Sequence, residues 1–308
     1  MIFKKLSLVI AFLYSFAAFS QEADSIQIIV KTFRGNEQRN YYGENAPKRL
    51  RLIWKISLGS GKSVVKDVPR IWTGAGWTGQ PLLFLEKGKP YLIQGAYDYN
   101  LRKIDAKTGK VAWAYKFDDI IKGTGTIWEN PDPDLPENRF VIMQGSRYGA
   151  KNDWEAKVIP SFRGISLITG KELWRMNVKQ TYSYSRDVDG SAIVVNDTAY
   201  IGLENGIFTV FNPDNKYAQL KDDILQPKIY RENRLFNDSD VLLHGVNFVT
   251  EASPTLIGNK IVIGACSRVY AYNLDTKKFD WNFYVATDID GTTVVTDDNK
   301  VLVTLERQ

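Results

Sequence analysis

A polar turn followed at a fixed spacing by a tryptophan recurs along this 308-residue chain, and it constrains the fold more than any other feature. Three copies share a four-residue step from turn to ring: Gly109 to Trp113, Gly170 to Trp174, and Lys277 to Trp281, where lysine replaces the glycine. A turn repeated in this way indicates one small structural unit that is copied along the chain. We therefore expect the fold to stack copies of that unit.

Each unit is built from short β-rich runs of about 5–8 residues separated by polar turns. In one pair, Ala192–Val195 and Thr198–Leu203 flank Asn196-Asp197, two residues that suit a hairpin turn. Two units are complete, 79–113 and 253–281, and two are partial, 165–174 and 191–211. Four strands in roughly 40–60 residues are typical of a propeller blade, whose two apolar faces are buried by neighbouring blades. The prediction is an all-β propeller of four-stranded antiparallel blades.

The repeat also predicts where its tryptophans lie. Trp113, Trp174 and Trp281 should occupy the outermost strand of their blades and be buried against the next blade. Arg51–Lys55 is similar to a closing strand with Trp54 in the same position, and Thr292–Leu305 is similar to an opening hairpin. This arrangement gives at least five blades. Either the N-terminal strands complete the last blade or the sequence is a fragment of a seven- or eight-bladed ring, and we favour the fragment.

The turn sequences resemble a known family. Asp105–Trp113 and Thr169–Trp174 match the D-x-x-T-G-x-x-x-W repeat of the pyrroloquinoline-quinone (PQQ)-type propellers, the quinoprotein alcohol dehydrogenase-like superfamily, over roughly residues 50–306. The same repeat builds dehydrogenases, outer-membrane assembly lipoproteins and other exported propellers. Cys266 is the only cysteine, so the vicinal cysteine pair, the haem-attachment motif and a lipidated cysteine near the cleavage site are all missing. The resemblance therefore implies a non-catalytic member.

The N-terminus predicts export. Residues 1–20 combine Lys4 and Lys5 with an apolar run too short to span a bilayer, which is typical of a cleaved signal peptide; an uncleaved anchor is the alternative. The mature chain, 21–308, is expected to form one propeller domain in the periplasm or outside the cell, without a transmembrane span and as a monomer. The net charge of +5 falls to +3 without the two lysines, which is too weak to indicate nucleic-acid binding.

Two segments share the pattern D-x-D-G, and each precedes the first strand of a unit. They contribute the carboxylates of Asp187, Asp189, Asp288 and Asp290. Glu251 and Gln80 lie at matching positions of other units. Because first strands line the channel of a propeller, these side chains should form a mostly acidic ring at one mouth. Such a ring suits calcium or sugar hydroxyls. The alternative is ordinary turn chemistry.

Trp72 and Trp77 flank the glycine-rich stretch 73–76, where they could stack a planar ligand or a sugar ring. The alternative for this pair is packing between blades. Residues 129–160 and 212–247 are longer and more polar than a blade needs, so they are expected to be insertions on a blade face, where recognition often occurs.

These features favour an exported, non-catalytic propeller of the cell envelope that binds a protein or a glycan. The alternative is a PQQ-dependent or other redox oxidoreductase, for which only the D-x-D-G carboxylates offer a base. A glycan hydrolase or lyase would need two convergent carboxylates at a set separation. No cofactor is assigned; PQQ and calcium both stay open.

Overall fold

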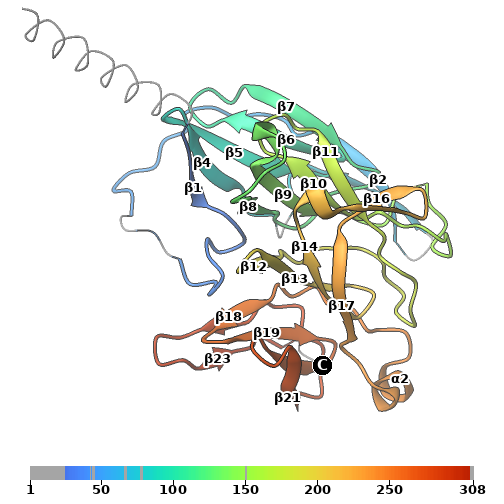
Figure 1. Cartoon of the computed structure of the whole chain (residues 1–308). Coiled ribbons are helices and arrows are strands. Elements are labelled where there is room, and N and C mark those ends of the chain that lie inside the picture. The colour runs from blue at the N-terminus through green and yellow to red at the C-terminus, as the bar shows by residue number, and fades with distance from the viewer. Residues whose placement is uncertain are drawn as a thin grey trace, which may run out of the picture.

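Antiparallel sheets follow one another along the chain in the computed structural model (Figure 1). The structure describes residues 25–41, 43, 46–65, 68–76, 79–149 and 151–305, so the expected signal peptide and Trp77 lie outside the described residues. Blade 1 contains β4 (Leu82–Glu86), β5 (Lys89–Gly95), β6 (Asn100–Asp105) and β7 (Val111–Lys116), and blade 2 contains β8 (Thr126–Glu129), β9 (Phe140–Gly145), β10 (Phe162–Ser166) and β11 (Glu172–Met176).

The C-terminal half repeats this order. Blade 3 contains β12 (Ile193–Val195), β13 (Thr198–Leu203), β14 (Ile207–Asn212) and β17 (Lys228–Arg234), and blade 4 contains β18 (Thr255–Ile257), β19 (Lys260–Ala265), β20 (Arg268–Asn273) and β21 (Lys278–Tyr284). A hairpin of β22 (Val294–Val295) and β23 (Val301–Leu302) then opens another unit. The predicted fold class, an all-β propeller of four-stranded antiparallel blades, is confirmed.

The remaining elements are small. Two further hairpins pair β2 (Ser60–Val65) with β3 (Val68–Thr73) and β15 (Gln219–Lys221) with β16 (Ile224–Gln226). Helix in the described part of the chain is limited to α2 (Asp238–His244) and the 3-10 turns η1 (Pro136–Asn138) and η2 (Asn215–Tyr217). No helix there combines the length and the apolar character needed to cross a membrane.

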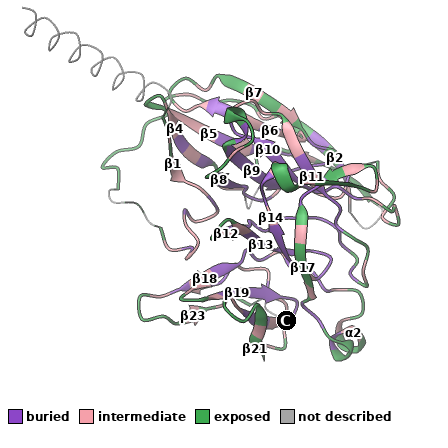
Figure 2. Ribbon diagram, in the orientation of Figure 1, coloured by how far each residue is buried: buried purple, intermediate pink, exposed green. Residues whose placement is uncertain are grey.

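The hydrophobic core lies between the blades, because each twisted sheet has two apolar faces to cover. Phe84 of blade 1 packs in one cluster with Ile142 of blade 2, and Phe211 of blade 3 packs with Trp174 of blade 2. Every residue of β9 is buried, as expected for a strand covered on both faces (Figure 2).

The tryptophans lie on the outermost strands β7, β11 and β21, as predicted. The Trp113 indole Nε1–H donates to the Leu167 carbonyl at 3.1 Å and covers Gly170, where a Cβ would lie 2.7 Å from the ring. Trp174 donates to the Pro213 carbonyl at 2.8 Å. Trp113 and Trp174 therefore each fasten their blade to a turn of the next one.

Burial of these rings differs from the prediction. Trp174 is 1% exposed and Trp113 is partly buried, but Trp281 is 42% exposed. The reason is that the sheet after blade 4 is only a two-stranded hairpin in the described residues, which offers no outer turn to cover the ring.

Two further expectations are wrong. Residues 51–59 form no strand, although Trp54 still donates to the Ala106 carbonyl at 2.8 Å, as Trp113 does one blade later. The expected insertions 129–160 and 212–247 contain β9 and β17, which are blade strands. A long loop before β9 and the β15–β16 hairpin before β17 had concealed the repeat spacing.

The N-terminal segment runs along the first strands, which sequence reasoning did not anticipate. β1 (Ile26–Val30) adds a fifth strand to blade 1 by pairing with β4. Beyond it, the Lys31 carbonyl accepts from Ile127 N of blade 2 at 2.7 Å, and the Glu37 carbonyl accepts from Leu256 N of blade 4 at 2.8 Å. Residues 31–40, called the axial segment below, therefore connect the inner edges of blades 2 and 4.

Candidate functional site

Loops that lead into the first strands meet around one cavity of about 320 Å³. Most of the residues that line it carry a carboxylate or hydroxyl group, namely Thr124, Asp189, Ser191, Glu251, Ser253, Asp290 and Thr292. Neighbouring loops are joined by hydrogen bonds, since Ser191 N donates to Ser253 Oγ at 2.9 Å and Ser191 Oγ donates to the Thr124 carbonyl at 2.7 Å. The cavity thus lies where radial repetition brings equivalent loops together.

The axial segment adjoins this cavity and is held in place by a buried arginine. Phe33 contributes to the cavity wall. Arg39 is fully buried, and its guanidinium donates to the carbonyls of Pro254 at 3.0 Å and Ser191 at 2.9 Å, and to Thr32 Oγ1 at 2.7 Å. Burial lowers the pKa of Arg39 to about 9. A buried cation bonded mainly to carbonyls ties the segment to blades 3 and 4.

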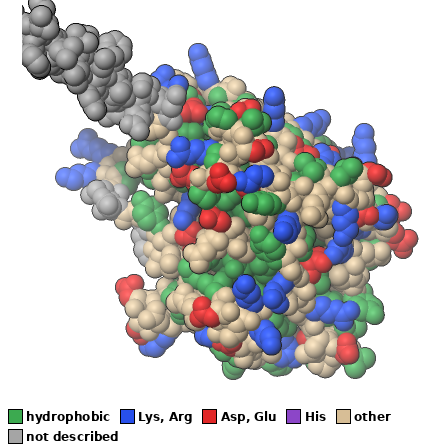
Figure 3. All heavy atoms as spheres, viewed as in Figure 1, with side chains coloured by type: hydrophobic (Ala, Val, Ile, Leu, Met, Phe, Trp, Pro, Cys, Tyr) green, Lys and Arg blue, Asp and Glu red, His purple; other side chains and the backbone are tan. Residues whose placement is uncertain are grey.

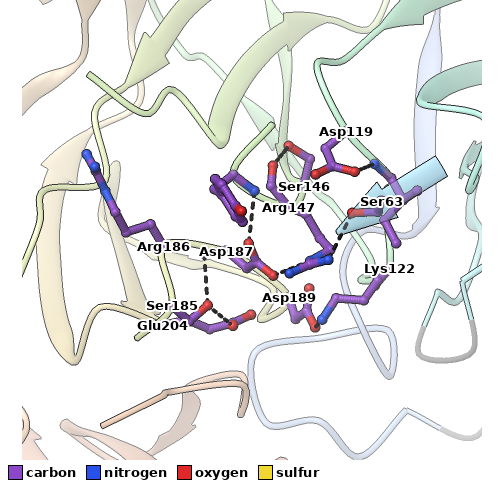
Figure 4. Close-up of polar contacts among 12 residues, drawn as sticks. Ser63, Asp119, Lys122, Ser146, Arg147, Ser185, Arg186, Asp187, Asp189 and Glu204 are labelled. Atoms are coloured by element: carbon purple, nitrogen blue, oxygen red, sulfur yellow. Dashed lines mark hydrogen bonds and ion pairs between the residues drawn. The ribbon is translucent and has the colours of Figure 1, made fainter. Parts of the chain in front are cut away.

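Three carboxylates converge beside the cavity. Asp189 precedes β12, Glu204 lies in the β13–β14 turn, and Glu251 precedes β18. One carboxylate oxygen from each lies within 4.8 Å of the other two. Lys122 forms an ion pair with Asp189, and Ser185 Oγ donates to Glu204 Oε2 at 2.6 Å (Figure 4).

A second ion pair borders this cluster. Arg147 Nε donates to Asp187 Oδ2 at 2.7 Å, and its Nη1 donates to Ser63 Oγ at 2.9 Å (Figure 4). Tyr148 N donates to the other Asp187 oxygen at 2.9 Å. Asp187 is therefore neutralised by its own partner.

Burial and nearby carboxylates raise the pKa of all three converging carboxyls. Burial is the largest cause for Glu204, followed by repulsion from Asp189, and the pKa of Glu204 lies well above its usual range. Burial also raises the pKa of Asp189, against the opposing charge of Lys122 and with a smaller contribution from Asp187. Burial and repulsion from Asp189 bring the pKa of Glu251 to about 7. Burial opposes ionisation of Lys122 as well, but Asp189 and Glu204 still hold the pKa of its ammonium well above its ordinary value. The cluster thus lacks positive charge and favours a cation or hydrogen-bond donors.

The structure brings part of the predicted ring together. Asp189, Glu251 and Asp290 line the cavity, and Asp187 lies beside them in the pair with Arg147. Asp288 Oδ2 accepts from Asn247 Nδ2 at 2.9 Å. Whether these residues bind a ligand stays a prediction.

The other predicted site residues lie elsewhere or have structural contacts. Gln80 Oε1 accepts from Arg34 N at 2.8 Å, which anchors the axial segment. Trp72 lies on β3, packs on Tyr97 with ring centroids 5.4 Å apart, and is not among the residues that line the cavity. Trp77 is outside the described residues.

Sequence reasoning missed Glu204, Lys122 and Arg147. Glu204 lies in the turn Glu204-Asn205-Gly206 after the second strand of blade 3, and nothing in that turn distinguishes it from an ordinary hairpin connection. β13 ends on the side of blade 3 where β12 begins, because the two strands are antiparallel. The Glu204 carboxylate therefore reaches the mouth, next to Asp189. Only the position of this turn in the repeat, between the second and third strands of the blade, could have indicated that Glu204 lies at the mouth.

Comparisons with known proteins support the fold. The quinohemoprotein alcohol dehydrogenase of Comamonas testosteroni matches with a TM-score of 0.56 and 14% identity over 89% of this chain and 45% of its own. The dehydrogenase ADHIIG of Pseudomonas putida HK5 matches with a TM-score of 0.53 and 12% identity over 92% of this chain and 44% of its own. The chain spans less than half the length of both enzymes.

BamB of Moraxella catarrhalis is also similar, with a TM-score of 0.49 and 10% identity over 80% of this chain and 67% of its own. No protein-family model matches the sequence, and no curated protein matches it. At such low identity, the two dehydrogenases show a shared fold alone.

Proposed function

We propose that this chain, which has the fold of the PQQ-type β-propellers, is an exported, non-catalytic binding module of the cell envelope that holds a protein partner across its channel mouth. The observation that carries the proposal is an exposed apolar rim beside the acidic cluster. The rim consists of Tyr182, Tyr184, Leu242, Leu243 and Val246, which are between 53% and 87% exposed. Exposed apolar groups gathered in this way are typical of protein interaction sites.

The rim is connected to the cavity through its backbone. Tyr184 N donates to the Val246 carbonyl at 2.9 Å, so the loop before blade 3 and the loop after α2 lie side by side. Ser183 Oγ donates to the Glu204 carbonyl at 2.6 Å. A partner seated on the rim would therefore lie next to the turn that carries Glu204.

The helix that carries the leucines is firmly held. Asn237 and Asp240 form a reciprocal capping box at its start, and His244 Nε2 lies 2.9 Å from Ser267 Oγ. Asp240 also pairs with Arg268 at 3.0 Å. With α2 held on its polar side, Leu242 and Leu243 are exposed to solvent (α2 in Figure 2; hydrophobic atoms over α2 at the lower right of Figure 3).

The chemistry of the rim favours protein over glycan. Aliphatic side chains contact apolar protein surface better than a hydroxyl-rich sugar, and tyrosines are enriched at protein interfaces. Glu251 and Asp290, the partly exposed carboxylates of the cavity wall, favour a partner with a basic or hydroxyl-bearing residue at the centre of its contact.

Site-specific photocrosslinking in the source cells tests this proposal. A photoreactive residue at Leu242 should give one discrete adduct, and binding of the purified partner should weaken at least tenfold with Leu242→Asp. The matched control is Leu220 on β15, which is 77% exposed. β15 pairs with β16, which lies apart from α2 in Figure 1. Equal adducts at both positions, or none at Leu242, would contradict the proposal.

Two further measurements address the rest of the proposed function. Mass spectrometry of the mature protein should place its N-terminus at Gln21 if the signal peptide is cleaved. Addition of PQQ and calcium to purified protein should leave no cofactor absorbance; a stable absorbance would support the oxidoreductase alternative instead.

A further inference from the structure

We propose that Asp189, Glu204 and Glu251 form a calcium site that ties blade 3 to blade 4 at the channel mouth. The site goes beyond the proposed function and does not depend on it, since the ion needs no partner. Asp189 and Glu204 belong to blade 3, and Glu251 leads into blade 4. The ligand set differs from the ring expected from the sequence, because Glu204 joins it and Asp187 does not.

The geometry allows one ion to contact all three residues. Calcium binds oxygen at about 2.4 Å, so two of its ligands can be at most about 4.8 Å apart. One oxygen from each of the three carboxylates lies within 4.8 Å of the other two. These separations are those that one calcium ion shared by the three carboxylates requires.

Two buried oxygens supply an independent indication of a ligand. Asp189 Oδ1 and Glu204 Oε1 have no hydrogen-bond partner among the described residues, although both side chains are more than nine-tenths buried. Their other oxygens are used, by Lys122 and by Ser185 Oγ respectively. Unpartnered buried carboxylate oxygens are costly, and a cation between them would remove that cost.

The local charge also calls for a divalent cation. Asp189, Glu204 and Glu251 carry three negative charges when ionised, and Lys122 supplies one positive charge. Asp187 is already paired with Arg147. A divalent ion makes the set neutral, whereas a monovalent ion leaves one charge uncompensated.

The donors select the class of metal. Only oxygen atoms are present, and hard cations prefer oxygen. The sole histidine, His244, is engaged with Ser267, and the sole cysteine, Cys266, is buried against the Asn247 carbonyl, so the nitrogen and sulfur ligands typical of zinc sites are lacking. Calcium tolerates irregular ligand sets completed by water, and the 320 Å³ cavity that Asp189 and Glu251 line has room for water ligands.

The test is calcium-dependent thermal stability of the full mature chain after removal of metal with a chelator. Calcium at about a hundredfold excess over Kd should raise Tm by about 5–10 °C. Terbium luminescence should report the same site, and calcium should displace the terbium. Magnesium at equal concentration should give a much smaller shift.

Glu204→Gln is the decisive variant. It removes a buried charge that has too little compensation, so the metal-free variant should melt at or above the metal-free wild type, while the calcium increment should disappear. Asp288→Asn is the matched control, a carboxylate of the same mouth outside the three, and it should keep the increment. A wild type without any calcium shift, or a Glu204→Gln protein with an unchanged shift, would overturn the site. An equal shift with magnesium would overturn the choice of calcium.

Discussion

Replacement of Trp174 by alanine should cause one of the largest losses of stability available by a single change in this protein. The ring is 1% exposed and packs on Phe162 and Phe211 with centroids 5.8 and 5.7 Å apart. Its Nε1–H donates to the Pro213 carbonyl of the next blade at 2.8 Å. The substitution therefore removes packing on both sides of the interface between blades 2 and 3 together with a hydrogen bond across it.

The magnitude follows from the area and the cavity. A buried tryptophan removes about 150–250 Å² from water, which at about 25 cal/mol per Å² amounts to about 4–6 kcal/mol. Measured truncations of buried aromatic residues cost about 3–5 kcal/mol, and a lost hydrogen bond adds about 1 kcal/mol. We expect a loss near 5 kcal/mol, which corresponds to a fall in Tm of about 10–15 °C.

Trp281→Ala is the internal control, since this residue holds the same position in the repeat but is 42% exposed. It should cost about 1–2 kcal/mol, because much of the ring already contacts water. Urea unfolding followed by far-ultraviolet circular dichroism measures both variants without relying on tryptophan fluorescence. Equal losses at the two positions would refute the reasoning, because the sequence position would then matter more than the covering blade.

Three further predictions concern the scaffold. Arg39→Met should destabilise the fold by about 3–5 kcal/mol, because the buried carbonyls it bonds lose their donors, and limited proteolysis should then cut the N-terminal segment faster than in the wild type. Gly170→Ala should cost about 1–3 kcal/mol more than Gly88→Ala in chemical denaturation: both glycines have φ +71°, but only at Gly170 would the new Cβ meet a tryptophan ring, and equal costs would refute the docking. Although burial opposes the shift, Arg102 lowers the pKa of Asp98 below 3.8, so the pair stabilises the fold above pH 3.8 and this stabilisation is lost as pH falls through the folded pKa. The difference in unfolding free energy between the wild type and Asp98→Asn should be about 1 kcal/mol at pH 6 and should vanish in acid; a difference that stays constant with pH would contradict this.

The blade architecture was readable from the sequence because it depends on local patterns. The turn Asp105–Gly109 needs a residue with positive φ at its end, and Gly109 and Gly170 both have it. Lys277, which replaces that glycine, also adopts positive φ, at 56°, and its N–H closes the turn on Asn273 as Gly109 does on Asp105. Turn chemistry and strand alternation act between near neighbours, so they leave a mark in the order of residues.

The approximate position of the acidic mouth could also be predicted. Asp189 and Glu251 precede first strands, and a radial repeat brings such positions together whatever the exact tilt of the blades. This reasoning depends on symmetry alone. It could not distinguish Asp189, which joins the cluster, from Asp187, which is paired with Arg147.

The tertiary structure alone decided the rest. Arg39 bonds the Pro254 carbonyl across 215 positions of sequence, and Glu204 reaches the mouth from a turn with no distinguishing pattern. Trp113 and Trp281 have equivalent sequence contexts but different exposure, because burial depends on what the next sheet supplies. Contacts of this kind depend on how whole blades pack, and packing is a property of the assembled shape that no local pattern of residues encodes.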